Sequence, residues 1–373
     1  MKIGERVVLK DDAVTVLKEA RDEGSLCLKR ALQINSGGVT IKNRWKTSCD
    51  EPYWVSFGET GNWAYPEECF RKVEKEKTMQ KLISYFTDGI SSETLQTIGA
   101  EVETQFVDKD GKAVQTQTSQ QMLDYLAENG WTVDCRKGNL ITTLVDQDDN
   151  KIFYELGRHN IEVSTTTSTP ACVLDVTRKC LAQLYESARM VGAEPYFAPI
   201  LHGEEDLLII PDERDAIWLK LDGRDALAPL ARTSSVQFTI SVAPKDAMGI
   251  LNRFGEHIGL FLADFPQDAV WKRYIVDSSA KYLSNRYGGP LAFESLEDYC
   301  RALARHDVVQ GVRLVPFQDV SNLEVSLYLR SIWWHFRLKR YGNTLCIEVR
   351  PMARRADEQF QQQLDKVLAI VCA

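Results

Sequence analysis

Residues 98–106 read Ile98-Gly99-Ala100-Glu101-Val102-Glu103-Thr104-Gln105-Phe106. Apolar and polar side chains alternate along this run, which predicts a β-strand. Because side chains two positions apart point to one face of a sheet, the carboxylates of Glu101 and Glu103 would project side by side. Two adjacent anions repel each other, so a cation or a cationic substrate between them would stabilise the pair. A surface strand that binds nothing is the alternative interpretation of this motif.

The composition limits the classes of protein to which the chain can belong. With 373 residues and 44% hydrophobic content, it can bury one large core or two smaller ones. A net charge of -8 argues against a nucleic-acid partner, because binding to phosphate backbones needs clustered Lys and Arg. No apolar run approaches the length of a membrane span, and residues 1–5 lack the apolar core of a signal peptide. We therefore expect neither nucleic acid nor a membrane as a partner.

Nine cysteines are scattered along the chain without a Cys-x-x-Cys pair. An odd, unpatterned set is typical of reduced thiols, and not of a disulfide framework or a zinc site. We expect a cytoplasmic protein.

Residues 1–73 differ in character from the rest of the chain. Short apolar runs at 6–9, 38–41 and 53–57 are separated by turn-forming residues, which predicts a small all-β barrel domain of Src-homology-like type. The aromatic residues of this segment would form either its core or a groove for a peptide or protein partner. The charged residues 71–77 are expected to form a linker or the start of a helix, and the second domain would cover residues 74–373.

From residue 79 onward, helical and strand-like patterns mix without strict alternation. The spacing of apolar residues predicts helices at 79–89, 119–129, 170–192, 245–261, 296–306 and 357–371. Strands are predicted at 98–106, 140–145, 151–154, 235–242, 323–329 and 345–349, with a turn feeding a further strand within 155–164. This mixture indicates an α+β fold with helices packed on the outer face of the sheet.

Other charged and polar residues fall on these predicted strands. Glu162 follows a glycine-bearing turn and adds a third carboxylate, and Glu348 and Arg350 share one side of a strand. Gln237 lies on a strand whose alternate residues are polar, and residues 337–341 form a basic cluster. Each has a plain alternative, such as a surface ion pair or a solvated face. Together, acidic strands that suit metal ions and arginines that suit phosphates are the equipment for polarising the terminal phosphate of a nucleotide.

The order of these motifs resembles glutamate–cysteine ligase of the plant and proteobacterial type, whose catalytic domain is similar to glutamine synthetase. The matching pieces cover residues 79 to about 355 and are, in family order, Leu82-Ile83-Ser84-Tyr85-Phe86-Thr87-Asp88-Gly89, Ile98-Gly99-Ala100-Glu101-Val102-Glu103, Tyr154-Glu155-Leu156-Gly157-Arg158-His159-Asn160-Ile161-Glu162, Arg232-Thr233-Ser234-Ser235-Val236-Gln237, Arg337-Leu338-Lys339-Arg340-Tyr341 and Glu348-Val349-Arg350. The resemblance implies a glutamine synthetase-like catalytic domain, in which an antiparallel sheet forms a funnel and helices cover its outer face.

The resemblance also implies an activity. ATP and Mg²⁺ would enter the funnel, a glutamate γ-carboxylate would be phosphorylated, and the amine of a second amino acid would attack the acyl phosphate. Phosphorylation supplies the leaving group that a free carboxylate lacks, and magnesium neutralises repulsion between the carboxylate and the triphosphate. Such an enzyme would act on small-molecule amino acids in glutathione biosynthesis.

Residue roles follow from the same motif match. It implies metal binding by Glu101, Glu103, Glu162 and Glu348, with Glu155 and Gln237 as further candidates. It implies that Arg337 and Arg350 stabilise charge on the transferred phosphoryl group or the substrate carboxylate. ATP or substrate binding is implied for Glu155, Arg232, Thr233, Gln237 and Lys339. His159, in the turn before Glu162, is expected to face outward from a loop.

The chain also departs from the family. It reads Glu348-Val349-Arg350-Pro351-Met352-Ala353, without the acidic residue that the family has shortly after its Glu-x-Arg motif. The strand after Gln237 lacks the family's Asn and Asp, and residues 1–73 are unlike the family's N-terminal part. The sequence therefore supports membership of the ligase class more strongly than a specificity for glutamate and cysteine. Two alternatives stay open, namely a ligase for a peptide or protein recruited by the barrel, and a nucleotide- or amino-acid-binding protein with weakened catalysis.

Overall fold

The computed structural model of the chain describes residues 75–92, 96–208 and 213–373, excluding the side chains of 75–77 and 213–215, and six short strands between residues 6 and 72. The chain divides into two compact units. One unit comprises residues 1–82, 304–310 and 314–329, and the other comprises residues 83–303, 311–313 and 330–373.

Two small antiparallel sheets occur in the described part of the first unit. β1 (Arg6–Leu9) pairs with β2 (Val39–Thr40) and β6 (Phe70–Lys72), while β4 (Trp54–Ser56) pairs with β3 (Asn43–Trp45) and β5 (Ala64–Pro66). The strands predicted at 6–9, 38–41 and 53–57 coincide with β1, β2 and β4. The predicted closure into a barrel and the aromatic groove fall outside the described residues.

The prediction of a strand at 323–329 is wrong, because these residues lead into the helix α12 (Val325–Arg330). Val325, Tyr328 and Leu329 are buried, at the i, i+3 and i+4 spacing of one helical face, whereas Leu327 is 49% exposed. Apolar alternation over so short a run fits both a strand and a helix, and packing decides between them.

The second unit is built on a nine-stranded antiparallel sheet. Its strands lie in the order β18-β19-β13-β7-β11-β10-β9-β8, and β12 pairs with one end of β7. Their bounds are β7 (Ile98–Val107), β8 (Thr132–Lys137), β9 (Leu140–Val145), β10 (Lys151–Tyr154), β11 (Asn160–Ser164), β12 (Glu194–Tyr196), β13 (Ser235–Ser241), β18 (Phe336–Tyr341) and β19 (Thr344–Ala353). The strand that carries Glu101 and Glu103 is therefore central, and the α+β class with an antiparallel sheet is confirmed.

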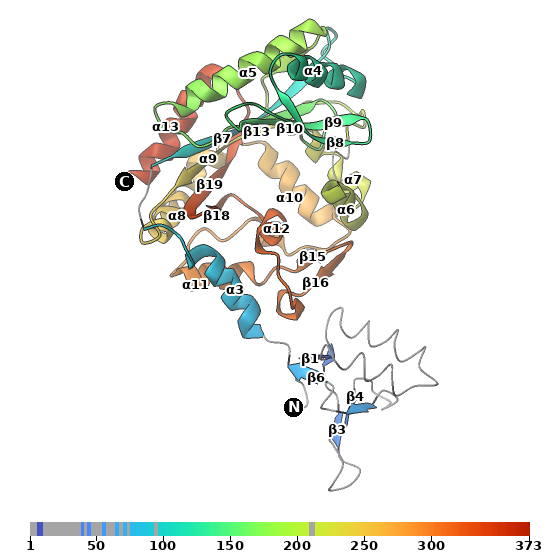
Figure 1. Ribbon diagram of the computed structural model, residues 1–373, viewed down its shortest axis with the longest axis vertical. Coiled ribbons are helices and arrows are strands. Elements are labelled where there is room, and N and C mark those ends of the chain that lie inside the picture. Colours follow the sequence, from blue (N-terminus) through green and yellow to red (C-terminus); the bar gives the residue numbers. More distant parts are fainter. Residues whose placement is uncertain are drawn as a thin grey trace. The chain divides into compact units, whose positions relative to one another are not determined.

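The rest of the described chain, in both units, consists mainly of helices and short strands. The helices described in the chain include α3 (Lys75–Thr87), α4 (Thr116–Glu128), α5 (Val173–Met190), α6 (Glu213–Asp222), α7 (Arg224–Leu227), α8 (Ala247–Glu256), α9 (Ile258–Leu262), α10 (Gln267–Asp277), α11 (Leu296–Leu303) and α13 (Phe360–Val371). The short strands β14 (Tyr287–Gly288), β15 (Val308–Gln310), β16 (Arg313–Val315) and β17 (Trp333–Trp334) complete the set. Figure 1 shows α4 and α5 on the upper side of the sheet and α10 below it.

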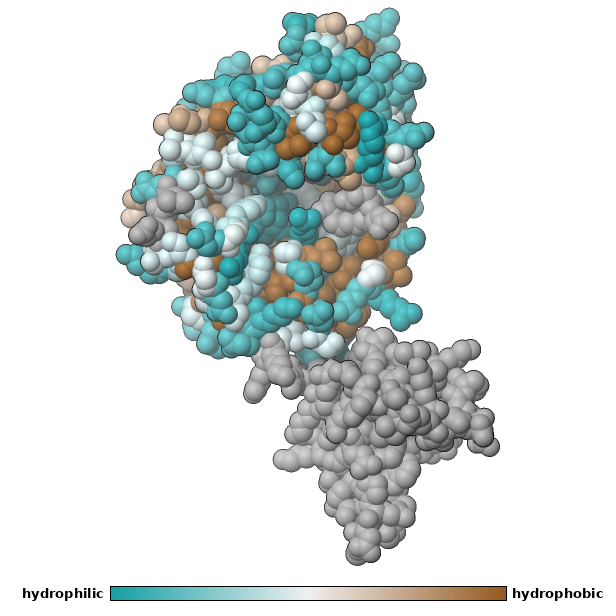
Figure 2. Space-filling view, viewed as in Figure 1, coloured by the Kyte–Doolittle hydropathy of each residue, from teal (hydrophilic) through white to brown (hydrophobic). Residues whose placement is uncertain are grey.

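One face of the sheet is apolar and is covered by helices. Its residues include Ala100 and Val102 of β7, Val163 of β11 and Phe238 of β13, all of which are buried. α5 packs on β7 and β11, α4 on β9, and α8 and α9 on the β18–β19 end. The outer surface over α4 and α5 is mainly hydrophilic (Figure 2), as expected for amphipathic helices. The burial of this apolar face supplies the main stabilisation of the unit.

The helix predicted at 245–261 is two helices, because α8 ends before His257 and α9 begins after it. α8 also touches a neighbouring backbone. A Cβ at Gly255 would lie 1.7 Å from the carbonyl oxygen of Leu291, whereas a Cβ at Gly249 would lie 3.9 Å from the nearest atom, on the side chain of Arg253.

We expect Gly255→Ala to lower the free energy of unfolding by about 3 kcal/mol, because two packed backbones must separate. Gly249→Ala, in the same helix, is the matched control and is expected to raise that free energy by roughly 0.5–1 kcal/mol through helix propensity. Chemical denaturation of both variants measures the difference, and equal midpoints would contradict the close contact at Leu291.

Candidate active site

The strand register gathers polar residues on the sheet face opposite the apolar one, which we call the polar face. Cα partners across the strands include Glu103 with Glu162, Gln237 with Glu101, and Glu348 with Arg337. Directly paired residues share a face, and so do residues two apart on a strand. The polar face therefore carries Glu101, Glu103, Glu155, Glu162, Ser235, Gln237, Thr239, Arg337, Lys339, Glu348 and Arg350. We call Glu101, Glu103, Glu155 and Glu162 its acidic half, and Arg337, Lys339, Arg350 and the enclosed Glu348 its basic half.

Glu103 is held in one orientation by β13. The backbone N–H of Ser235 donates to Glu103 Oε2 at 2.8 Å, and the Ser235 hydroxyl donates to Oε1 at 2.8 Å. Gln237 Nε2 also donates to Oε1, at 3.2 Å. Since hydrogen bonds to a carboxylate are strong and directional, these donors fix the Glu103 side chain at the junction of β7 and β13.

The acidic half concentrates negative charge in a buried place. Burial, together with the nearby charge of Glu155, raises the pKa of Glu103 to about 8. Burial likewise raises the pKa of Glu162 well above its ordinary value, and Glu101, Glu155 and Glu103 add to the rise. Glu155 lies close enough to Glu162 to act on its pKa, and a proton on one of the two carboxyl groups would relieve the repulsion between them. A bound cation would take over the role of these protons.

In the basic half, the buried carboxylate of Glu348 lies among three cations. Arg337 Nε donates to Glu348 Oε2, and Arg350 Nη1 donates to the same oxygen at 3.2 Å. The Lys339 ammonium forms an ion pair with Oε1. Burial raises the pKa of Glu348, but the three cations outweigh that effect and hold the pKa well below its usual range. Glu348 is therefore an anion that organises cations.

Lys339 connects the two halves. Its Nζ lies 3.5 Å from Glu101 Oε1 on β7, in addition to its contact with Glu348 on β19. Burial lowers the pKa of Lys339, but Glu101 and Glu348 outweigh that effect and raise it, so the ammonium stays charged. Because β19 and β13 separate β18 from β7 in the strand order, this contact indicates that the sheet curves toward the polar face.

Three buried acceptor atoms of the polar face have no hydrogen-bond partner among the described residues, namely Gln237 Oε1, Thr239 Oγ1 and Glu348 Oε1, and the last of these is in an ion pair with Lys339. Gln237 is only 5% exposed, and its Nε2 is engaged by Glu103, so its free oxygen is held beside the acidic half. A buried polar atom without a partner is costly, and a bound cation or donor would satisfy it.

The acidic half fits a divalent cation in the chemical kind of its donors. Mg²⁺ prefers oxygen ligands, and the carboxylates of Glu103, Glu155 and Glu162 with the amide oxygen of Gln237 supply them. In the described part of the chain, no three His, Cys, Asp or Glu side chains are already arranged as a metal centre. The cation would therefore have to draw these groups together. Glu348 does not fit as a ligand in this arrangement, because both of its oxygens face cations.

Two residues predicted to line a substrate pocket make local contacts. Arg232 donates to the carbonyl oxygens of Leu201 and Glu205, so it stabilises the loop that contains them. Thr233 Oγ1 donates to the carbonyl of Leu230 at 2.8 Å. Their role in substrate binding stays a prediction.

The Asp268–His335 pair was not found by the sequence reasoning. His335 Nε2 lies 3.5 Å from Asp268 Oδ1, and the carbonyl of His335 accepts a hydrogen bond from the backbone N–H of Arg350 at 3.0 Å. The pair therefore adjoins the basic half. The signal in the sequence is that His335 precedes Arg337 by two positions, whereas nothing in it points to Asp268 on α10.

His159 does not face outward, because its side chain is completely buried. Its Nε2 lies 2.9 Å from Gln105 Oε1. At the predicted turn, a Cβ on Gly157 would lie 2.4 Å from the carbonyl oxygen of Ala231 and 2.9 Å from Cε1 of His159, so the glycine leaves room for the buried ring. Burial lowers the pKa of His159 to about 3.

This burial predicts acid sensitivity. The folded protein holds His159 neutral, whereas in the unfolded chain the imidazole binds a proton near pH 6.5. The buried neutral imidazole therefore contributes fully to the free energy of unfolding above pH 6.5. This contribution is lost as the pH falls toward 3, and the loss reaches about 3 kcal/mol at pH 4.5. We expect His159→Gln to flatten the fall in unfolding free energy between pH 6.5 and 4.5. The exposed His202, changed to Gln, is the control, and equal slopes for both variants would contradict the assignment.

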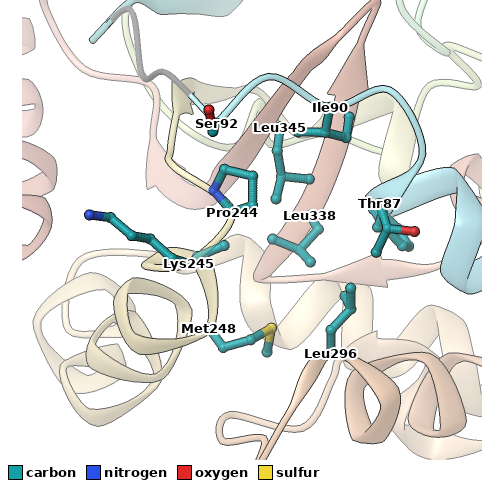
Figure 3. Close-up of a pocket in the computed structure, with 11 residues that line it drawn as sticks. Thr87, Ile90, Ser92, Pro244, Lys245, Met248, Leu296, Leu338 and Leu345 are labelled. Atoms are coloured by element: carbon teal, nitrogen blue, oxygen red, sulfur yellow. The ribbon is translucent and has the colours of Figure 1, made fainter.

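A cavity of about 480 Å³ lies on the opposite side of the same strands. Leu338 of β18 and Leu345 of β19 form its floor, and residues of α3, α8 and α11 line its sides (Figure 3). Since Leu338 lies between Arg337 and Lys339 in sequence, its side chain points away from the polar face. The cavity and the polar face therefore share strands but not a surface.

The chain resembles known proteins in structure and not in sequence. No protein-family model matches the sequence, and no curated protein matches it. Among solved structures, the chain is similar to a bifunctional glutathione synthetase from Pasteurella multocida, with 13% identity and a TM-score of 0.46 over 79% of this chain and 40% of that chain. It is also similar to the glutamate–cysteine ligase of Francisella tularensis in complex with AMP, with 13% identity and a TM-score of 0.37 over 70% of this chain and 61% of that chain.

A third similar structure is the glutamine synthetase of Plasmodium falciparum, with 10% identity and a TM-score of 0.36 over 98% of this chain and 66% of that chain. The chain thus spans less than two thirds of the length of each of these three proteins.

In the described residues, no helix has the length and apolar character needed to cross a bilayer.

Proposed function

We propose that the protein is an ATP- and Mg²⁺-dependent carboxylate–amine ligase. One observation carries the proposal: a single sheet face places four crowded carboxylates next to a cluster of three cations. The carboxylates provide a place for a divalent cation, and the cations provide a place for phosphate and carboxylate anions. The transfer of a phosphoryl group to a carboxylate needs both, because two anions must be brought together.

In the proposed reaction, an oxygen of the substrate carboxylate attacks the γ-phosphorus of ATP, and the bond from that phosphorus to the ADP oxygen breaks. The amine nitrogen then attacks the carbonyl carbon of the acyl phosphate, loses a proton, and expels phosphate as the amide forms. Glu103, Glu155, Glu162 and Gln237 would hold the cation, which supplies neutralisation of phosphate charge when bound. Arg350 and Arg337 would stabilise the charge of the transferred group.

The geometry also supports different roles for the two arginines. Arg350 is only partly buried, with 21% of its side chain exposed, whereas Arg337 is almost fully buried and donates to the carbonyl of Ile332. Of the two guanidinium groups, that of Arg350 is therefore within reach of a substrate, and Arg337 mainly keeps Glu348 in place. We propose glutamate as the carboxylate substrate and an amino-acid amine, with cysteine first, as the acceptor.

An assay of ADP release tests this proposal. The full chain is incubated with ATP and Mg²⁺, first with glutamate alone and then with cysteine, ammonium or other amines. Hydroxylamine is added in parallel, because it attacks an acyl phosphate to give a hydroxamate. We expect Mg²⁺-dependent hydroxamate formation with glutamate, and turnover that needs an amine. Absence of ADP release and of hydroxamate with every carboxylate and amine would overturn the proposal.

A further inference from the structure

The ammonium of Lys339 lies where two carboxylates from different strands converge. It forms an ion pair with Glu348 Oε1 and lies 3.5 Å from Glu101 Oε1. Glu348 is completely buried, and 20% of the Glu101 side chain is exposed. Glu101 of β7 and Glu348 of β19 lie on the same face of the sheet, and carboxylates placed in this way can act as ligands of a second divalent cation. In this chain, Lys339 lies between them.

The charges around this position exclude a further cation. Arg337 and Arg350 both contact Glu348 Oε2, and Lys339 contacts Oε1. Both oxygens of this carboxylate are therefore already engaged by positive groups. A divalent ion between Glu101 Oε1 and Glu348 Oε1 would meet the Lys339 ammonium directly and be repelled by it, whereas both guanidinium groups contact the other oxygen of Glu348. The acidic half differs, because Glu103 and Glu162 are direct partners on neighbouring strands and Gln237 Oε1 has no partner among the described residues.

We infer that Lys339 replaces a second metal ion, so the polar face binds one divalent cation, at Glu103, Glu155 and Glu162. This inference rests on the proposed function for the identity of that cation. The lysine is a permanent positive charge that needs no metal supply, and its cation–π contact with the Tyr341 ring, 5.7 Å from Nζ, helps to orient it.

Counting bound Mn²⁺ tests the inference without an activity measurement. Mn²⁺ suits the same carboxylate ligands as Mg²⁺ and is visible by electron paramagnetic resonance. The full chain, without nucleotide, is titrated with Mn²⁺, and free and bound ions are separated by equilibrium dialysis. We expect one Mn²⁺ per wild-type chain. Two or more would overturn the inference, and none would overturn it together with the cation site of the proposed function.

Variants of Lys339 test the number of bound ions further. Lys339→Met is expected to bind a second Mn²⁺, and the double variant Lys339→Met with Glu101→Gln is expected to bind only one. Lys339→Arg is also expected to bind one. Lys179→Met, on the exposed side of α5, is the control and keeps one. A Lys339→Met chain that folds, by circular dichroism, and still binds one ion would contradict the replacement. If that variant does not fold, the wild-type count decides.

The two proposals fail in different ways. A wild-type chain that binds two Mn²⁺ ions and still forms the hydroxamate overturns the role of Lys339 and leaves the ligase proposal intact. A chain that binds one Mn²⁺ and forms no acyl phosphate with any carboxylate overturns the ligase proposal and leaves the role of Lys339 intact.

Discussion

Glu103→Gln is expected to lower the rate of ADP release about a thousandfold while making the folded protein more stable. The loss of rate follows because the amide keeps the shape of the side chain but not the charge that holds a cation, and such an electrostatic contribution is worth several kcal/mol in the transition state. The carbonyl oxygen that glutamine keeps can still accept from the backbone N–H of Ser235, and its NH2 group can donate to the Ser235 hydroxyl.

The gain in stability follows from the raised pKa of Glu103, which is about 8 in the folded protein against 4.5 ordinarily. A carboxyl group with a raised pKa favours folding less as the pH rises, because the unfolded chain releases its proton at a lower pH. Between pH 4.5 and 7 this linkage costs up to about 3 kcal/mol, and glutamine removes the cost. The free energy of unfolding of the variant is therefore expected to exceed that of the wild type at pH 7 and to match it near pH 4.5.

Glu194→Gln is the matched control, because Glu194 is exposed on β12, which also pairs with β7. We expect it to change neither the rate nor the pH profile of stability. A Glu103→Gln variant with the wild-type rate of ADP release would show that the acidic half does not take part in the reaction.

Arg350→Ala is expected to reduce ADP release by about a thousandfold, with little loss of stability. The Arg350 guanidinium is more accessible than that of Arg337, and preorganised cations contribute several kcal/mol to the transfer of a phosphoryl group. Glu348 would remain neutralised by Arg337 and Lys339, so no buried charge is left without a partner. Arg350→Lys is expected to restore little of the rate, since lysine cannot bind a phosphate or carboxylate in a bidentate way.

Arg355→Ala is a suitable control, because Arg355 pairs with Asp264 at the surface, where an ion pair contributes about 0–1 kcal/mol. The rates of both variants are compared by ADP release, and their folding by thermal unfolding. If Arg350→Ala and Arg355→Ala turn over equally fast, the placement of the phosphate group at the basic half is wrong.

Much of the framework could be predicted from local patterns. The alternation around Glu101 and Glu103 identified β7, and the helical spacing of apolar residues identified α3, α4 and α5 close to their observed bounds. Alternation also determines which residues of a strand share a face, and every strand that contributes to the polar face obeyed it. Local pattern failed where two periods fit the same short run, as at Val325, and at His159, whose buried ring contacts Gln105 from a distant part of the sequence.

The sequence by itself determined that Glu101 and Glu103 point to the same side of a strand, because that depends only on the two-residue period of extended backbone. Only the tertiary structure decided what lies opposite them. Lys339 is 238 residues from Glu101 along the chain, yet its ammonium reaches that carboxylate across the curved sheet. Such a meeting depends on strand order and register, which arise from the packing of the whole apolar face and leave no trace in the spacing of any single motif.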